Sequence, residues 1–219
     1  MKPRPSTQRN QALTITEVLA TVAAASLLAL VALAQSDDSR ARAQRINCVN
    51  NLKEVGLAFL IWGGDNNDQY PMQVPAKKGG AKESAEKGIV YPVFQVMSNE
   101  LGSTPKILIC PADTGRFAAD SFTAGFDNSK VSYFVGVDAG DDRPAMLLSG
   151  DDNFAIDDAP VKSGLLLLAT NAPVSWTAER HVNQGNIGLA DGSVQTTGSS
   201  FLRQMLVQTG TATNRLALP

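Results

Sequence analysis

The sequence predicts an α+β fold in which one long N-terminal helix packs on a small antiparallel sheet. Residues 13–34 are almost entirely apolar, and the polar residues 35–45 that follow contain no proline or glycine to stop a helix. The C-terminal half instead holds short apolar runs separated by segments rich in Asp, Gly and Ser, which is typical of strands. We therefore expect one helix of about 50 residues, followed by a sheet.

Residues 13–34 form the first part of this helix. At about 1.5 Å of rise per residue, about 22 residues extend roughly 33 Å, which is enough to cross a bilayer. Glu17 is the one charged residue among them. A lone carboxylate in hydrocarbon costs several kcal/mol unless a partner neutralises it. We therefore predict a transmembrane segment over residues 13–34 in which Glu17 has a partner.

Basic residues set the orientation of this segment. Lys2, Arg4 and Arg9 precede it, and the next basic residue is Arg40. Because cytoplasmic flanks are enriched in Lys and Arg, we predict a single-pass protein with its N-terminus in the cytoplasm. The rest of the chain then lies outside the cytoplasm.

The helix is expected to continue over residues 35–62. Apolar side chains recur there at spacings of 4, 3, 4 and 3 residues and form one stripe, made of Cys48, Leu52, Val55, Phe59 and Trp62. Such a stripe has to be buried, so we expect it to pack against the sheet of the same chain; a coiled-coil partner is the alternative. The glycines at 63–64 are typical of a helix end.

Residues 63–219 are predicted to be one α+β head domain, beginning with a loop-like segment over 65–88. Short helices are expected over residues 91–101 and 198–208. Strands are expected over residues 107–110, 131–137, 145–148, 165–170 and 186–190, with a last extended segment to Pro219. The run at 165–170 is apolar enough for a central strand.

The Asp-Gly pair at residues 191–192 predicts a two-residue hairpin turn, because such turns need positive φ angles. This turn would place Leu189 opposite Val194 and Ile187 opposite Thr196. The apolar pair is expected to face the helix.

Composition and motifs exclude several classes of function. A net charge of −2 and a pI near 5.4 leave no basic surface of the kind that binds nucleic acid. The sequence lacks the His-Glu-x-x-His, Cys-x-x-Cys and Gly-x-Ser-x-Gly motifs and a phosphate-binding glycine loop. We therefore predict that the protein is not an enzyme, with no catalytic residues and no cofactor.

The start of the chain resembles the class III signal of type IV prepilins and type II secretion pseudopilins. The resemblance rests on a basic leader ending in the small residue Ala12, on the Leu-Thr-Ile-Thr-Glu run at residues 13–17, and on the apolar helix behind it. In that family a membrane peptidase cuts after the small residue, usually Gly, and methylates the new N-terminal residue, usually Phe. The resemblance implies a leader peptide over residues 1–12, cleavage between Ala12 and Leu13, methylation of Leu13, and an assembly role for Glu17.

That family also implies a pilin-like fold and a structural role in a type IV pilus-like or type II secretion filament. The implied partners are prepilin peptidase, other pilin or pseudopilin subunits, an inner-membrane platform and an assembly ATPase. The protein would lie in the inner membrane with a periplasmic head, and later in a pilus or pseudopilus. An ordinary signal peptide cleaved after residues 32–34 (Ala-Leu-Ala) and a plain membrane anchor are other interpretations. The alternative function is a membrane-anchored extracytoplasmic enzyme, or a ligand- or metal-binding module, that uses a prepilin-type leader.

A second stretch carries a further resemblance. His181, then nine residues, then Asp191 and Gly192 resemble the His-x9-Asp-Gly processing-associated domain of prepilin-like proteins of the planctomycete and verrucomicrobial type. Segments that agree with the same family span nearly the whole chain, at residues 48–58, 110–113, 132–133, 150–153 and 214–219. The resemblance makes His181, Asp191 and Gly192 motif residues without implying a role for them.

Geometry limits the chemistry of this motif. A strand over residues 186–190, at about 3.3 Å per residue, would hold His181 and Asp191 roughly 15 Å or more apart. His181 is also the only histidine in the sequence. We therefore predict a hydrogen-bonded structural histidine and assign no metal site; metal binding and catalysis are the alternatives.

Three acidic pairs lie at residues 141–142, 151–152 and 157–158. They are predicted to be solvated loop charges. A calcium ion held by one pair together with backbone carbonyls is the alternative.

Cys48 and Cys110 are the only cysteines. Because an extracytoplasmic compartment is oxidising and Cys48 lies on the apolar stripe, we predict a disulfide between them, with two buried thiols as the alternative. Closing a loop of about 62 residues would restrict the unfolded chain by roughly 4 kcal/mol in the chain-entropy model.

Overall fold

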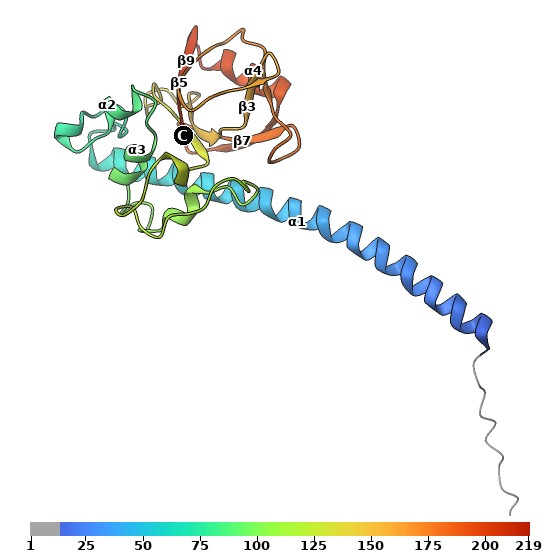
Figure 1. Ribbon diagram of the computed structural model, residues 1–219. Helices are drawn as coiled ribbons and strands as arrows, with labels where there is room; N and C mark the ends of the chain where they lie inside the picture. Colours follow the sequence, from blue (N-terminus) through green and yellow to red (C-terminus); the bar gives the residue numbers. More distant parts are fainter. Residues whose placement is uncertain (1–13) are drawn as a thin grey trace, which may run out of the picture. The chain divides into compact units, whose positions relative to one another are not determined.

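The computed structural model describes the backbone of residues 14–219 and the side chains of residues 14–28 and 39–219. Its first element is helix α1, Ile15–Asp65 (Figure 1). The chain divides into two units, and the second, residues 43–219, holds the last part of α1 and every other element.

No helix within the described residues is both long and apolar enough to cross a membrane. The transmembrane segment predicted over residues 13–34 lies partly outside the described residues, and it stays a prediction.

The second unit has the predicted α+β class. Its helices after α1 are α2 (Lys82–Ala85), α3 (Tyr91–Val96) and α4 (Ser199–Gln208), and its 3-10 turns are η1 (Ala76–Lys78), η2 (Pro105–Leu108) and η3 (Asn128–Lys130). Its strands are β1 (Tyr133–Gly136), β2 (Leu147–Asp151), β3 (Phe154–Ile156), β4 (Ala159–Pro160), β5 (Gly164–Ala169), β6 (Val174–Trp176), β7 (Gln184–Leu189), β8 (Val194–Gly198) and β9 (Thr213–Leu218).

Six strands form the main sheet, in the order β5-β9-β1-β2-β7-β8, and every neighbouring pair is antiparallel. A smaller sheet has the order β4-β3-β6. Successive residues of a strand face opposite sides of a sheet. Tyr133 and Val135 of β1 accordingly join the core on the α1 side, whereas Phe134 joins a second core on the other side.

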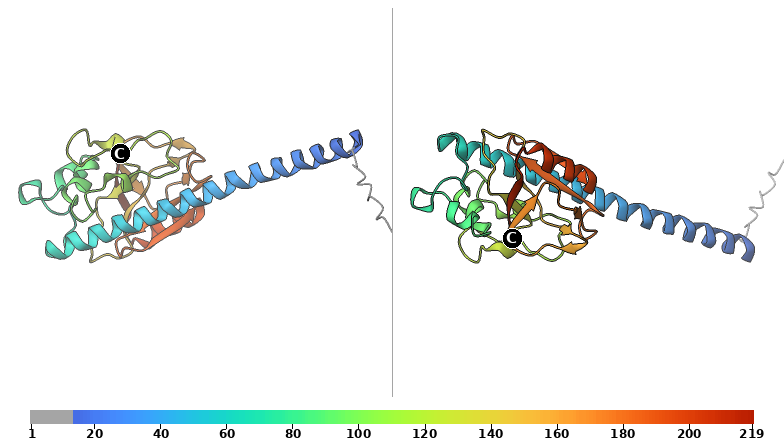
Figure 2. Two further views of the ribbon diagram at one scale, coloured as in Figure 1. Left: turned by 90° about the horizontal axis from the view of Figure 1, so that it is seen from below. Right: turned by 90° about the horizontal axis from the view of Figure 1, so that it is seen from above.

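The first core lies between the main sheet and the last part of α1. The predicted stripe is buried there, since Cys48, Val55 and Phe59 are 0% exposed, Leu52 is 1% and Trp62 is 6% exposed. The prediction that this face packs on the sheet of the same chain is confirmed. Both views in Figure 2 show this cyan part of α1 lying across the second unit.

Helix α4 and the smaller sheet cover the other face of the main sheet. Phe154 of β3 and Trp176 of β6 stack with their ring centroids 4.7 Å apart. Leu202 and Leu206 of α4 are fully buried in the same core. The helix predicted over residues 198–208 is therefore present, with its apolar side inward.

Before the first strand, one predicted helix is shorter than expected and one predicted strand is wrong. The helix predicted over residues 91–101 ends at Val96 and continues as turns up to Gly102, whose φ is 61°. The strand predicted over residues 107–110 is absent, because η2 occupies part of it. A four-residue apolar run does not distinguish a strand from a helical turn, and Pro105 favours a helical start.

The strand predicted over residues 165–170 exists as β5, but its predicted central place is wrong. β5 lies at the edge of the main sheet. Leu167 is 63% exposed while Leu168 is fully buried. Alternate leucines thus face solvent and core, which a continuous apolar run does not reveal.

The strand predicted over residues 145–148 starts at Leu147 and runs on to Asp151. This extension carries Asp151 into the sheet, opposite Tyr133 of β1. The prediction of solvated loop charges at residues 151–152 is therefore wrong for Asp151, which is 0% exposed.

The hairpin predicted at the Asp-Gly turn exists as β7 and β8, but its register differs by one residue. The predicted opposition of Leu189 with Val194 and of Ile187 with Thr196 is wrong. The observed partners are Gly188 with Val194, Ile187 with Gln195, and Asn186 with Thr196.

This difference arises because the turn is three residues long. The N–H of Leu189 donates to the carbonyl of Ser193 at 2.8 Å, and between them only Gly192 has a positive φ, 81°. One glycine in the left-handed region is typical of three-residue hairpin loops. A Cβ placed on Gly56 of α1 would lie 3.4 Å from the Cα of Gly192, so the helix and the turn approach each other closely.

Candidate metal centre

Four buried side chains from four separate segments meet between α1 and the main sheet. Cys48 lies on α1, Cys110 follows η2, Asp151 ends β2, and His181 precedes β7. The first three are 0% exposed and His181 is 3% exposed. Each offers one metal-ligating atom, and these atoms all lie within 4.8 Å of one another.

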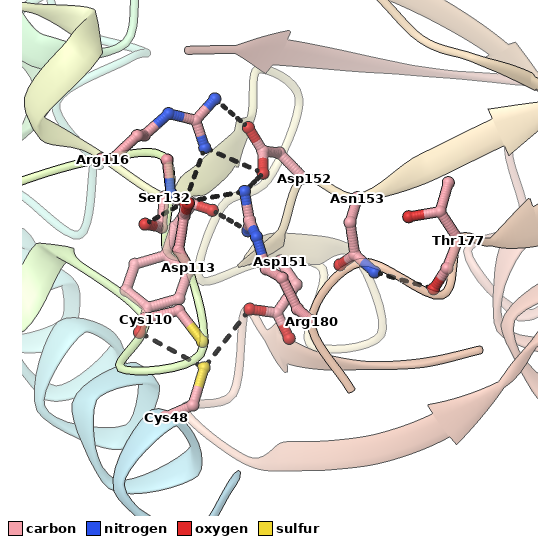
Figure 3. A network of polar contacts seen from close by, with 12 residues as sticks. Cys48, Cys110, Asp113, Arg116, Ser132, Asp151, Asp152, Asn153, Thr177 and Arg180 are labelled. Carbon is pink, nitrogen blue, oxygen red and sulfur yellow. Dashed lines mark hydrogen bonds and ion pairs between the residues drawn. The ribbon is translucent and has the colours of Figure 1, made fainter. Parts of the chain in front are cut away.

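The contacts within this cluster are short. The two sulfur atoms are 3.0 Å apart. Cys48 Sγ lies 3.3 Å from Asp151 Oδ1, and Cys110 Sγ lies 3.3 Å from His181 Nε2. His181 Nε2 is 3.5 Å from Asp151 Oδ2. Figure 3 shows the sulfurs of Cys48 and Cys110 facing each other, with the carboxylate of Asp151 beside them.

Hydrogen bonds from the sheet hold Asp151 in place. The backbone N–H of Asn186 donates to Asp151 Oδ2 at 2.7 Å, and the side-chain amide of Asn186 donates to the same oxygen at 2.9 Å. Both donors belong to β7, which pairs with β2. Oδ1 is left facing Cys48.

The backbone around His181 is held in an unusual conformation. Val182 and Asn183, which follow it, have φ angles of 54° and 59°. A β-branched residue such as valine is strained in this left-handed region. Arg45 of α1 donates to the carbonyl of His181 at 2.9 Å, which fixes the loop against the helix. The strained turn thereby directs the imidazole inward while Val182 stays exposed.

Burial and mutual contact shift the pKa values in the cluster. A hydrogen bond with Cys48 lowers the pKa of Cys110 to about 6, helped by His181. The hydrogen bond with Cys110, together with burial, raises the pKa of the Cys48 thiol. Their mutual contact thus shifts the pKa values of the two thiols in opposite directions. Burial raises the pKa of Asp151 and that of Tyr133, whose hydroxyl lies 3.4 Å from Cys48 Sγ.

A second group of polar side chains lies next to the cluster, and in this group positive and negative charges are equal in number. Arg116 contacts Asp113 at 3.1 Å and Asp152 at 2.7 Å, and Arg180 contacts Asp113 at 2.9 Å and also pairs with Asp152. Ser132 donates to Asp113 at 2.8 Å. Two arginines thus neutralise two carboxylates (Figure 3).

A cleft of about 560 Å³ opens beside this second group and is lined partly by Asp113, Arg116 and Arg180. Because these charges already pair with one another, little of their charge remains for a ligand. The four-residue cluster, by contrast, contains four lone-pair donors and no permanent cation. It is the better candidate site.

The predicted disulfide is absent from the structure. Cys48 and Cys110 are adjacent, but both are free, and a separation of 3.0 Å exceeds the S–S bond length of about 2.05 Å. The sequence does not place Asp151 beside the cysteines, because the Gly-Asp-Asp run at 150–152 is typical of a solvated loop. The backbone extension of β2 is what buries it.

The two halves of the His-x9-Asp-Gly motif lie in different surroundings. His181 is hydrogen-bonded and buried, as predicted, but its partners make it a potential metal ligand. Asp191 is exposed in the hairpin turn, and its carboxylate accepts a hydrogen bond from the N–H of Ser193 at 2.9 Å. The acidic pairs at 141–142 and 157–158 are exposed, and within the described residues neither belongs to a metal-ligating group.

The predicted processing residues Ala12 and Leu13 lie outside the described residues. Glu17 has a local partner at the start of α1. Its carboxylate accepts from the N–H and from the hydroxyl of Thr14, both at 2.9 Å, while its own N–H donates to Thr14 Oγ1 at 3.4 Å. This reciprocal pattern is a capping box, which satisfies free N–H groups at a helix start.

Comparison with known proteins adds no relative, since no protein-family model, no curated protein and no solved structure matches this chain. The site is therefore interpreted from its own geometry.

Proposed function

We propose that this protein is a pilin-like structural subunit of a type IV pilus-like or type II secretion filament. Prepilin peptidase would cut between Ala12 and Leu13 and methylate Leu13. Before assembly, the mature protein would reside in the inner membrane with its head domain in the periplasm. An inner-membrane platform and an assembly ATPase would then add it to a filament of pilin or pseudopilin subunits.

The observation that most supports this proposal is helix α1. It is 51 residues long, and its last part packs on an antiparallel sheet. Its first part has no such packing, since Ile15 is 80%, Leu19 63% and Leu28 71% exposed. An apolar helix of this length is suited to packing against lipid and against the equivalent helices of neighbouring subunits.

Glu17 would select the register between subunits. Cleavage after Ala12 would create a cationic amine on Leu13, close in sequence to Glu17, and subunits at the correct stagger would pair the two charges. Removing one member of a buried ion pair costs about 3–5 kcal/mol. The capping box means that Glu17 also stabilises the helix start. A test has to separate these two roles.

Two substitutions separate them. Glu17→Gln keeps an acceptor for the capping box but removes the charge, so we expect normal membrane insertion and cleavage with no incorporation into sheared filaments. Thr14→Val breaks the cap and keeps the charge, so incorporation should persist. Immunoblots of membrane and sheared fractions measure both. Normal filament yield from Glu17→Gln would contradict the pairing role, and an equal defect in both variants would leave Glu17 as a cap alone.

Processing has its own measurement. Mass spectrometry of the mature N-terminus, in a host with prepilin peptidase, should find Leu13 carrying one methyl group. A host without the peptidase is the control and should yield the uncut chain. A mature start at Gln35 would indicate an ordinary signal peptide and would contradict the filament proposal.

The second candidate function is a membrane-anchored enzyme or metal-binding module. The cluster of Cys48, Cys110, Asp151 and His181 is the observation that favours it. Catalytic metal sites keep an open coordination position for water or substrate. Since these four side chains are 0–3% exposed, a structural role fits them better than a catalytic one.

A further inference from the structure

We propose that Cys48, Cys110, Asp151 and His181 bind one Zn²⁺ ion, which serves as a structural centre of the second unit. The inference does not depend on the filament proposal, because it concerns only contacts within residues 43–219.

The donor set selects the metal. Two sulfurs, one imidazole nitrogen and one carboxylate oxygen match the ligands that zinc takes in four-coordinate protein sites. Calcium and magnesium prefer oxygen ligands throughout, so the two cysteines argue against them. Thiolate ligands also favour zinc over manganese.

The distances are close to those around a tetrahedral ion, although the two sulfurs would have to move apart. Zinc–sulfur bonds of about 2.3 Å and zinc–nitrogen bonds of about 2.0–2.1 Å place neighbouring ligand atoms about 3.3–3.8 Å apart. In the structure the sulfurs are 3.0 Å apart, Cys48 Sγ is 3.3 Å from Asp151 Oδ1, and Cys110 Sγ is 3.3 Å from His181 Nε2. His181 Nε2 is 3.5 Å from the other carboxylate oxygen, Asp151 Oδ2. Side-chain adjustments of less than about 1 Å would accommodate the ion.

Groups outside the four ligands are arranged to support coordination. Asn186 saturates Asp151 Oδ2 with two hydrogen bonds, which leaves Oδ1 to bind the ion beside Cys48. The hydroxyl of Tyr133 lies 3.4 Å from Cys48 Sγ, close enough to donate to a thiolate. Such outer contacts orient the ligands and raise metal affinity.

The charge of the cluster also calls for a cation. As zinc ligands, two thiolates and one carboxylate would carry three negative charges in a buried site, where uncompensated charge is disfavoured. Zn²⁺ would offset two of these charges. The neighbouring Arg116 and Arg180 form their ion pairs with Asp113 and Asp152.

A closed site of this kind would join four segments that are distant in the sequence. The ion would connect α1 to the loop after η2, to the end of β2 and to the loop before β7. It would therefore hold α1 on the sheet at the point where the helix enters the second unit. It would also keep both thiols reduced, since coordinated sulfurs are unavailable for a disulfide.

The first experiment measures metal in the full-length chain, purified in mild detergent under reducing conditions without chelators. Elemental analysis should find one zinc per chain. Removing the zinc with a chelator should lower Tm by more than about 10 °C, and Zn²⁺ but not Mg²⁺ should restore it. Replacement by Co²⁺ should give the thiolate charge-transfer and intense visible bands of a tetrahedral site.

Variants test the assignment of ligands. His181→Ala and Asp151→Ala should each lower zinc affinity by more than about 100-fold. Asp191→Asn is the matched control: it changes the exposed carboxylate of the same sequence motif and should keep one zinc per chain. If a ligand variant fails to fold, the unaltered chain supplies a second test, because a cysteine-directed mercurial should release one equivalent of zinc to a chromogenic chelator.

Several results would overturn the proposal. These are a reduced chain that neither contains zinc nor binds added Zn²⁺, a purified chain in which Cys48 and Cys110 form a disulfide without metal, and a folded His181→Ala variant that keeps full zinc affinity.

Discussion

The two ends of helix α1 differ in what their apolar side chains contact. Near its start, Ile15, Leu19 and Leu28 are 80%, 63% and 71% exposed. Near its end, Val55 and Phe59 are 0% exposed against the sheet. The first part is apolar all round, whereas the second has one buried apolar stripe and an opposite face that mixes polar residues with exposed apolar ones such as Leu57. One helix can therefore have an exposed apolar part and a part that packs on a sheet. The arrangement of its apolar residues around the helix, more than their number, distinguishes the two parts.

The packed end of α1 should give the largest effect on stability. Phe59 packs between Tyr70 and Phe94, with ring centroids 5.6 Å and 6.2 Å away. Phe59→Ala should therefore lower the free energy of unfolding by about 3–5 kcal/mol. Leu57→Ala, on the opposite face and 56% exposed, should change it by less than about 0.5 kcal/mol. Urea unfolding followed by tryptophan fluorescence measures both, and similar losses would contradict the one-sided packing.

The contact between α1 and the hairpin turn should give an intermediate effect. Gly192 has a φ of 81°, and a Cβ there would lie 2.9 Å from Leu60 Cδ1 of α1. Gly192→Ala should therefore cost about 1–2 kcal/mol, mainly through left-handed backbone strain. Gly64→Ala is the control, because Gly64 is helical with open space around its Cα, and it should raise stability by up to about 1 kcal/mol. An unchanged unfolding midpoint for Gly192→Ala would show that the turn relaxes.

The exposed end of α1 should give the smallest effect on folding. Leu27 is 68% exposed, so Leu27→Lys should leave the free energy of unfolding of the second unit unchanged within about 0.5 kcal/mol. If residues 13–34 span a membrane, the same lysine costs about 2.5–3.5 kcal/mol there and should reduce the membrane-bound fraction. Leu27→Ile is the control and should remain membrane-bound. Equal partition of both variants would contradict the predicted span.

Local patterns were the most reliable guide from sequence to fold. The apolar stripe from Cys48 to Trp62 correctly predicted a helix face that packs on the sheet, because a helix period is visible within a few turns. The Asp-Gly pair at 191–192 correctly predicted a hairpin, but not its three-residue loop. Residues 107–110 were misassigned, because an apolar run this short fits a strand and a 3-10 turn equally.

The candidate site was only partly visible in the sequence. Cys48 and Cys110 were expected to meet, and they do, although as free thiols. His181 was expected to be structural and distant from Asp191, and it is buried while Asp191 is exposed. The sequence indicates Asp151 only as one of several acidic residues that could hold calcium, and not as a neighbour of the cysteines, because an Asp-Asp pair after glycine is usually a solvated loop. The clue lies in the apolar run that precedes Asp151: β2 continues through Ser149 and Gly150, so Asp151 belongs to the strand and is not in a loop.

The sequence by itself determined the periodic elements of this protein: the helix stripe, the β1 and β7 strands and the turn that joins β7 to β8. These depend on residues a few positions apart, whose preferences act locally. Only the tertiary structure decided which distant side chains share a buried volume. Two features bring together the four side chains of the cluster: the pairing of β2 with β1 and β7, and the packing of the last part of α1 on the sheet. Register and packing of this kind follow from the whole chain, since a shift of one residue in a strand would turn Asp151 to the opposite face.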